Sequence, residues 1–87
     1  RIRSHLAHPS WQVRVQAVRA LGPIAGHGDV ARMQALLADP EWWVRYRAAQ
    51  ALAALPFLGT AELASLSAND RFAADIMRQV LAERENA

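Results

Sequence analysis

Hydrophobic residues recur along this chain with the spacing of α-helices and not with the alternation of strands. Apolar side chains three or four positions apart occupy residues 11–21, 30–37 and 40–55, and two later stretches, 60–66 and 70–81, continue the pattern. The positions expected to face a core, in residues 11–24 and 40–55, are Val13, Ala17, Ala20, Leu21, Ile24, Val44, Ala48, Ala51, Leu52 and Leu55. The pattern predicts an all-α fold.

Two helix starts are marked by residue type. Asp39-Pro40 predicts that a helix begins at residue 40, because aspartate is a frequent N-cap and proline fits the first helical position. Asn69 is the expected cap of the last helix, and we expect residues 82–87 to fray into a charged tail.

The chain repeats itself at a nearly constant period. A shift of 31 residues places Trp11 on Trp42 and residues 13–21 on residues 44–52. A further shift of 29 places residues 69–81 on residues 40–52. Similarity at a fixed period, with two helices in each unit, is typical of an α-solenoid. We therefore predict a short α-solenoid of two to three helical hairpins.

The repeats divide one domain of 87 residues. Their expected ranges are 1–25 (partly truncated), 29–55 and 60–85. The third unit is more polar than the others, with Arg71 and Asp75 where Trp42 and Tyr46 stand in the second. A solenoid that ends must face water, so residues 60–85 are either a third repeat or a C-terminal cap.

The pattern V-R-x-x-A-x-x-A-L at residues 13–21 and 44–52, after a proline-containing turn, resembles the HEAT-like repeats. The likeness is to the short kind, of about 30 residues, seen in phycobilin lyase subunits and many bacterial proteins. In such repeats the arginine reaches an aspartate of a neighbouring turn and forms a ladder along the stack. The resemblance implies that Arg14 pairs with Asp39, and Arg45 with Asp70 or Asn69.

Charge is unevenly distributed along the chain. The net charge of +2 is made of seven arginines and three acids in residues 1–47, and three arginines and five acids in residues 48–87. This asymmetry would steer a partner or stack molecules end to end, or is an ordinary solvated surface. Cysteine is absent, which excludes disulfides and thiolate metal sites.

The alanine-rich, lysine-free composition and the first residue, Arg1, favour a piece of a larger bacterial protein. The longest mainly apolar run, residues 48–58, is far shorter than the ~20 residues that cross a bilayer, so we expect no membrane contact within this segment. The sequence predicts neither the cellular location nor the oligomeric state.

A helical wheel places three rows of side chains on the outward face of the second helices: Gln12/Trp43/Phe72, Gln16/Arg47/Ile76 and Arg19/Gln50/Gln79. Because tryptophan and arginine are frequent interface hot spots, Trp43, Arg47 and Phe72 are the leading candidates for partner binding. The supporting candidates are Gln12, Gln16, Arg19 and Gln50. Alternatively, Trp43 and Phe72 cover gaps between helices. Trp11, Trp42 and Tyr46 are expected to pack between repeats.

Catalytic and metal-binding patterns are weak. His5 and His8 have a spacing that suits a metal on a helix, but Pro9 interrupts it and no carboxylate is near in sequence. No serine belongs to a recognisable triad, and residues 26–28 are too short for a phosphate loop. The sequence therefore predicts no enzyme activity, no metal and no cofactor.

Three functions are compatible with these features. The first is a protein–protein interaction module that acts as a scaffold. The second is nucleic-acid binding, in which Arg14, Arg19, Arg45 and Arg47 would contact phosphates, as some HEAT-like families do. The third, implied by the resemblance to lyase subunits, is an accessory role in a lyase-type enzyme.

Overall fold

The computed structural model describes the backbone of residues 2–85 and the side chains of residues 4–84, and within this part the chain contains helices and no strands. The all-α prediction is confirmed. The α-helices are α1 (Ile2–His5), α2 (Trp11–Leu21), α3 (Val30–Ala35), α4 (Trp42–Ala53), α5 (Thr60–Ser67) and α6 (Arg71–Glu85). Short 3₁₀ turns occupy Gly22–Ile24, His27–Asp29 and Leu36–Ala38.

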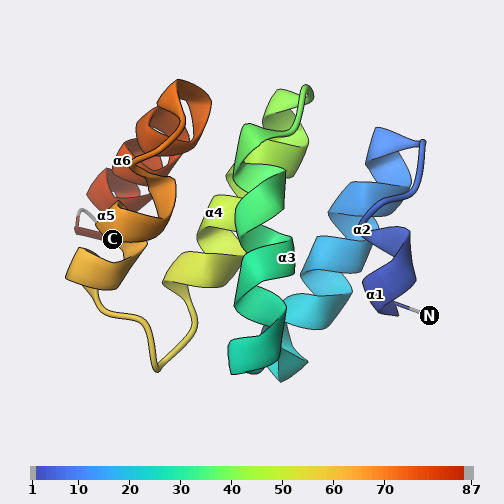
Figure 1. Cartoon of the computed structure of the whole chain (residues 1–87), viewed down its shortest axis with the longest axis horizontal. Helices are drawn as coiled ribbons and strands as arrows, with labels where there is room; N and C mark the ends of the chain where they lie inside the picture. The colour runs from blue at the N-terminus through green and yellow to red at the C-terminus, as the bar shows by residue number, and fades with distance from the viewer. Residues whose placement is uncertain (1, 86–87) are drawn as a thin grey trace.

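The helices form two layers (Figure 1). Helices α1, α3 and α5 lie side by side in one layer, and α2, α4 and α6 lie behind them. Helix α4 is central, since it packs against α2 on one side and α6 on the other. Three helix pairs stacked in this way make a short α-solenoid, as the repeat predicts.

The core lies between the two layers. Leu21, Leu37, Val44 and Leu52 are completely inaccessible to solvent, as is Met33. Burial of each such leucine stabilises the fold by roughly 1.5–3 kcal/mol. Ala48 and Ala49 are also inaccessible, and their small side chains let the neighbouring helices approach α4 closely.

The buried face of α2 differs from the predicted one. Val18 is 1 % exposed, whereas Ile24 is 61 % exposed and Ala20 is exposed as well. Helix α2 ends at Leu21, and Ile24 lies in the following 3₁₀ turn, which has three residues per turn and rotates it off the helical stripe. Val18 is buried because α2 contacts both α1 and α4.

The buried face of α4 is wider than predicted. Ala49 and Ala53 are buried in addition to the expected Val44, Ala48 and Leu52. A helix with neighbours on both sides needs a broad apolar arc, and the sequence pattern alone identified only the part that faces the other layer.

Both predicted helix starts are displaced by one or two residues. Helix α4 begins at Trp42, after Glu41 in an extended conformation (φ −93°, ψ 126°), and Asp39 Oδ1 accepts the Glu41 N–H at 2.9 Å. Helix α6 begins at Arg71, where Asp70 rather than Asn69 accepts a first-turn N–H.

The predicted fraying of the C-terminal tail is wrong for residues 82–85, which are helical. Arg84 donates to the carbonyl oxygen of Ala53 at 2.7 Å, so α6 binds the last residue of α4. This bond satisfies a carbonyl that has no partner within its own helix. Residues 86–87 lie outside the described part.

Candidate interaction surface

The outward face of α2 carries the three side chains that the helical wheel placed there. Gln12, Gln16 and Arg19 are all exposed. Gln12 accepts a hydrogen bond from the Ser10 hydroxyl at 2.9 Å, which holds it beside the start of its own helix. Of these three, Arg19, in the last turn of α2, also lines the groove described below.

Trp43 belongs to a group of three aromatic rings near the start of α4. Trp42 and Tyr46 stack with ring centroids 4.9 Å apart, and Trp43 meets Trp42 edge-on at 4.9 Å. Trp43 is 48 % exposed and Trp42 is 39 % exposed. We call these three residues the aromatic cluster. Such ring pairs contribute about 0.5–1.5 kcal/mol each, so the cluster holds its own shape while much of its surface faces water.

A groove with a volume of ≈ 600 Å³ lies between the later turns of α2 and α4. Arg47 donates to Gln50 Oε1 at 3.0 Å, and both residues line this groove with Arg19. We call it the α2–α4 groove, and Arg19 and Arg47 the groove arginines. Its lining residues are Val18, Arg19, Gly22, Pro23, Ala25, Arg47, Gln50, Ala51, Ala54, Leu55, Pro56 and Phe57. Three predicted site residues from two repeats therefore meet in one hollow.

A second hollow of ≈ 500 Å³ lies on the other side of α4, toward α6. The two hollows share Gln50, Ala54, Leu55 and Pro56, so the end of α4 forms a ridge between them. The second hollow contains Glu83 and Arg84, one acid and one base, whereas no acid lines the α2–α4 groove. The two sides of α4 thus differ in charge.

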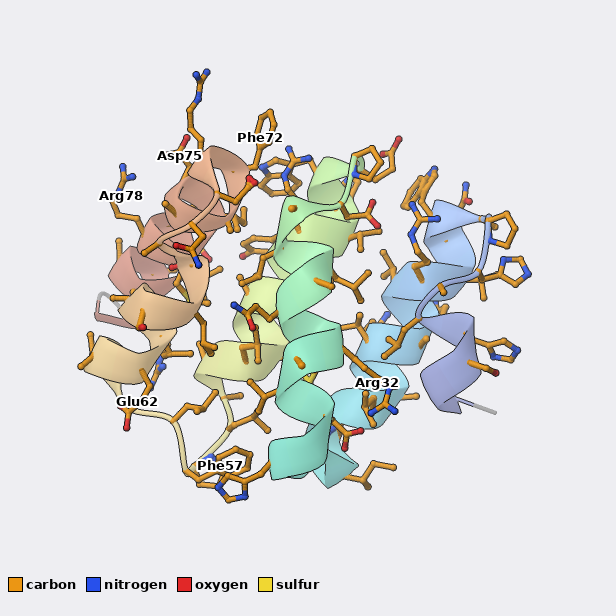
Figure 2. The ribbon with its side chains drawn as sticks, in the orientation of Figure 1. Arg32, Phe57, Glu62, Phe72, Asp75 and Arg78 are labelled. Carbon is orange, nitrogen blue, oxygen red and sulfur yellow. The ribbon has the colours of Figure 1, made fainter. Side chains whose placement is uncertain are left out.

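Phe57 is a groove residue that the sequence interpretation missed. Its ring stacks on His27 at a centroid distance of 3.9 Å, and this joins the connection after α4 to the turn before α3 (Figure 2). Residues 56–59 were interpreted only as a helix stop. An aromatic residue between Pro56 and Gly59 was the available signal, because a turn rarely needs a large apolar side chain.

Phe72 lies away from the α2–α4 groove. It is 54 % exposed, and the guanidinium of Arg45 lies 4.9 Å from its ring centroid. In Figure 2, Phe72, Asp75 and Arg78 point outward from α6. The predicted surface is therefore divided, with the groove on one side of the aromatic cluster and Phe72 with Arg45 on the other.

Ile76, placed by the wheel on the outward row of Gln16 and Arg47, is only 3 % exposed. Helix α6 packs on α4 with a stripe that includes Ile76 and Val80, which is rotated relative to the buried stripe of α4. The rotation follows from position: α6 has a second-layer neighbour on one side only, so its apolar stripe turns toward α4.

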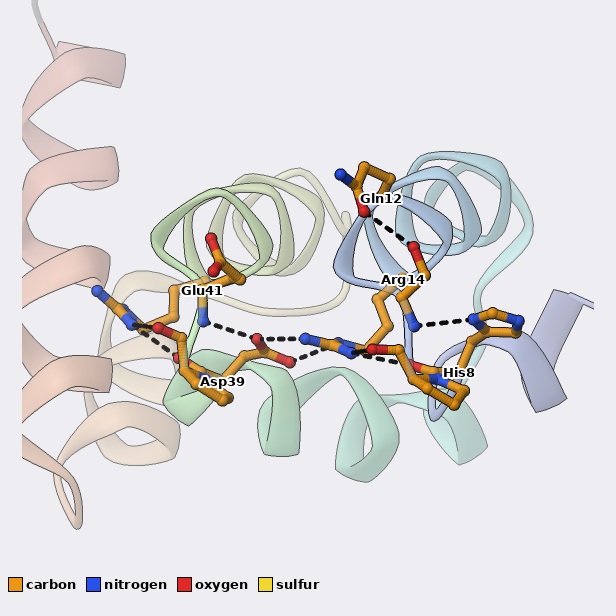
Figure 3. A network of polar contacts seen from close by, with 9 residues as sticks. His8, Gln12, Arg14, Asp39 and Glu41 are labelled. Atoms are coloured by element: carbon orange, nitrogen blue, oxygen red, sulfur yellow. Dashed lines mark hydrogen bonds and ion pairs between the residues drawn. The ribbon is translucent and has the colours of Figure 1, made fainter.

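Arg14 and Asp39 form the predicted link between repeats (Figure 3). Arg14 Nε lies 2.8 Å from Asp39 Oδ2, and Nη2 donates to Oδ1 at 3.0 Å. Nη1 donates to the carbonyls of His8 and Pro9. The two side chains are only 13 % and 6 % exposed. A bidentate, partly buried pair of this kind is among the stronger ion pairs in proteins.

The second predicted link is wrong. Arg45 donates to the carbonyls of Asp39 (2.7 Å) and Pro40 (3.2 Å), as Arg14 does to its own turn, but it has no acidic partner in the described part of the chain. Helix α6 begins 29 residues after α4, so the position equivalent to Asp39 is Ala68. Asp70 Oδ1 instead accepts the Phe72 N–H at 3.3 Å. We call Arg14 and Arg45 the turn arginines.

One titratable side chain on this face is perturbed. The Tyr46 hydroxyl donates to Glu83 Oε1 at 2.6 Å, and this hydrogen bond raises the pKa of Tyr46 above its ordinary value. The bond stabilises the neutral phenol that donates it. It also connects α4 to α6 across the outward face.

Metal and membrane sites find no support in the described residues. His8 Nδ1 accepts the Ser10 N–H at 3.0 Å, which gives this histidine a structural role in the turn before α2. Within residues 4–84, no three histidine, aspartate or glutamate side chains come together as metal ligands. None of the described helices combines the length and the apolar character that crossing a membrane requires.

The stacked helix pairs and the outward groove define an α-helical repeat protein. The family model of HEAT repeats matches residues 1–86, and the chain belongs to this family. HEAT repeats are commonly protein-interaction scaffolds and are generally non-enzymatic. Comparisons with curated proteins and with solved structures give no match.

Proposed function

We propose that this chain is a protein–protein interaction module that binds its partner along the outward face of α2 and α4. The observation that carries the proposal is the α2–α4 groove. It combines Arg19, Arg47 and Gln50 with an apolar floor, and the exposed aromatic cluster lies beside Arg47 on the same helix. Arginine and tryptophan next to an apolar hollow are the usual composition of interface hot spots.

A rigid framework supports a scaffold role. The Arg14–Asp39 pair fixes α2 against the turn that begins α4, and Arg84 binds the far end of α4 to α6. The groove between these helices is therefore formed before a partner arrives. A preformed site loses less conformational entropy on binding than a flexible one.

Nucleic-acid binding has less support. That function needs several arginines free to contact phosphates. Arg14 is 13 % exposed and paired with Asp39, and Arg45 is bound to two carbonyls. Among residues 4–84, only the groove arginines remain on this face. No observation favours an accessory role in a lyase-type enzyme.

The proposal is tested by affinity capture with the purified chain, followed by mass spectrometry of the bound proteins, for wild type and Trp43→Ala. Trp43 is half exposed, so its truncation should cost only about 1 kcal/mol of ring packing, leave the chain folded, and reduce partner recovery at least about tenfold. Ile24→Ala is the matched control, because Ile24 is 61 % exposed and lines neither hollow beside α4.

Partners recovered equally by wild type and Trp43→Ala would contradict the proposal. A fall in melting temperature with unchanged recovery would show that Trp43 serves only packing. Capture of nucleic acid that disappears steeply with added salt would replace the proposal by the nucleic-acid function.

A further inference from the structure

The α2–α4 groove combines an apolar floor with a one-sided charge. Val18 is 1 % exposed at its base, and Gly22, Ala51 and Leu55 continue the apolar lining. A volume of ≈ 600 Å³ lies within the range of sites that bury a small ligand or a few side chains. An occupant therefore presents at least one apolar group to this floor.

The groove arginines lack acidic partners. The ion pairs among residues 4–84 use Arg14, Arg32 and Arg78, and neither Arg19 nor Arg47 is among them. Arg47 donates to the neutral amide of Gln50 and lies 5.9 Å from the Tyr46 ring centroid. Two cations therefore face one hollow without an acid in its lining.

The negative ends of two helix dipoles neutralise only part of the positive charge of the groove arginines. Helices α2 and α4 both end near the groove, and each C-terminus is equivalent to about half a negative charge. Arg84 donates to the carbonyl of Ala53 and offsets part of that charge at α4. Two full positive charges exceed this sum, so the groove favours an anion.

We propose that the α2–α4 groove binds a short acidic segment of a partner protein, with one large apolar side chain on the floor and carboxylates paired with Arg19 and Arg47. The inference rests on the proposed function and specifies the chemistry of the partner. Arginine's planar fork matches a carboxylate in two parallel hydrogen bonds. A nucleic acid would leave the apolar floor unfilled, and two arginines supply few of the phosphate contacts that it needs.

The test uses fluorescence anisotropy with three labelled peptides and the 87-residue chain. The first peptide, Asp-Glu-Leu-Phe-Asp-Glu, has acids around an apolar centre. The second has serines in place of Leu-Phe, and the third has Asn and Gln in place of the acids. We expect saturable binding of the first peptide and at least about tenfold weaker binding of the other two, since each loses one of the two kinds of contact.

Three variants locate the binding. Arg19→Gln and Arg47→Gln should each weaken the first peptide about tenfold, the loss expected for one charge-assisted hydrogen-bonded contact. Arg78→Gln is the matched control, because Arg78 is exposed on α6 and pairs with Asp75. Its affinity should equal that of wild type.

A second pair of variants tests the site without removing an arginine, in case an arginine variant does not fold. Ala54 is exposed on the ridge beside the groove, so Ala54→Glu places a competing carboxylate at its rim and should weaken the acidic peptide. Ala64→Glu makes the same change at an exposed position of α5 and should have no effect. Circular dichroism melting confirms that each variant is folded.

The inference is overturned if no peptide binds, if the serine peptide binds as tightly as the first, or if Arg19→Gln and Arg47→Gln bind like Arg78→Gln. It is also overturned if duplex DNA competes with the peptide and binds more tightly. A captured partner lost from Trp43→Ala but retained by Arg19→Gln and Arg47→Gln would leave the proposed function intact and disprove only the acidic segment.

Discussion

The turn arginines and the groove arginines lie on the same two helices, and the fold uses them differently. Arg14 and Arg45 stand close to the starts of α2 and α4, where their guanidinium groups donate to the carbonyls of the preceding turn. Arg19 and Arg47 lie further along, where no turn carbonyl or carboxylate binds them. The difference shows that distance from the turn, not residue type, separates structural from available arginines.

The two turn arginines also differ from each other. Arg14 pairs with the carboxylate of Asp39, whereas the guanidinium of Arg45 lies over the Phe72 ring, 4.9 Å from its centroid. The position equivalent to Asp39 before α6, 29 residues later, is Ala68, so the acid is missing there. The stack of arginines and acids therefore ends after one step, and the third repeat is held by other contacts, including Arg84 on Ala53.

The largest effect is expected from Arg14→Met. The change leaves the carboxylate of Asp39, 6 % exposed, without its cation, and should lower the free energy of unfolding by about 3 kcal/mol. Urea denaturation followed by circular dichroism measures this loss. Arg19→Met, the same change on the same helix, should cost at most about 0.5 kcal/mol. Equal losses would remove the distinction between the two sets.

Asp39→Asn added to Arg14→Met should recover part of the lost stability, because a neutral side chain no longer requires a cation. The amide oxygen would still accept the Glu41 N–H. No recovery would mean that the loss arises from packing of the arginine stem.

Arg45→Met should have a smaller effect of about 1 kcal/mol. It removes hydrogen bonds to two carbonyls and the contact with Phe72, but leaves no buried acid behind. Urea denaturation again provides the measurement. Arg78→Met, which breaks an exposed pair with Asp75, is the control and should change stability by less than about 0.5 kcal/mol. A loss at Arg45 as large as that at Arg14 would show that the acid is unimportant.

Removing both groove arginines should change stability very little. Arg19→Met combined with Arg47→Met eliminates two cations that have no acidic partner, so we expect the free energy of unfolding to change by less than about 0.5 kcal/mol. A thermal melt of the double variant beside wild type is sufficient. A large loss would place these arginines with the turn arginines.

The smallest effect concerns Tyr46. Its pKa is raised by the hydrogen bond to Glu83, so folding gains stability from this contact below the ordinary tyrosine pKa and loses it as pH rises through the folded-state pKa. Tyr46 is the single tyrosine, and an absorbance titration of tyrosinate reads it directly. Glu83→Gln should lower its midpoint, while Arg47→Met should raise it slightly, because the Arg47 charge acts in the opposite direction.

Repetition made much of the fold predictable. The V-R-x-x-A-x-x-A-L pattern identified paired helices and the family, because both depend on spacing within or between units, and the resemblance to that family implied the Arg14–Asp39 pair. Helix starts were predicted only to within one or two residues, and the extra buried alanines of α4 were not predicted. They depend on which neighbours a helix has and on how a turn is hydrogen-bonded, and neither is a property of the local pattern.

The candidate surface was predictable only in part. The wheel correctly identified Gln12, Gln16 and Trp43 as outward side chains, but it also placed Ile76 there. It provided no means to see that Arg19 and Arg47 share a groove that Phe57 also lines, because the three residues come from three separate segments.

The sequence by itself determined the helical repeat, its period and the apolar stripe that faces the other layer, since these follow from residue spacing along one chain. Only the tertiary structure decided that Arg19 and Arg47 line one groove together with Phe57. That outcome depends on the approach of α2 to α4 and on the path of the chain after α4. Distances between side chains of different repeats are set by packing, and packing is a property of the assembled helices.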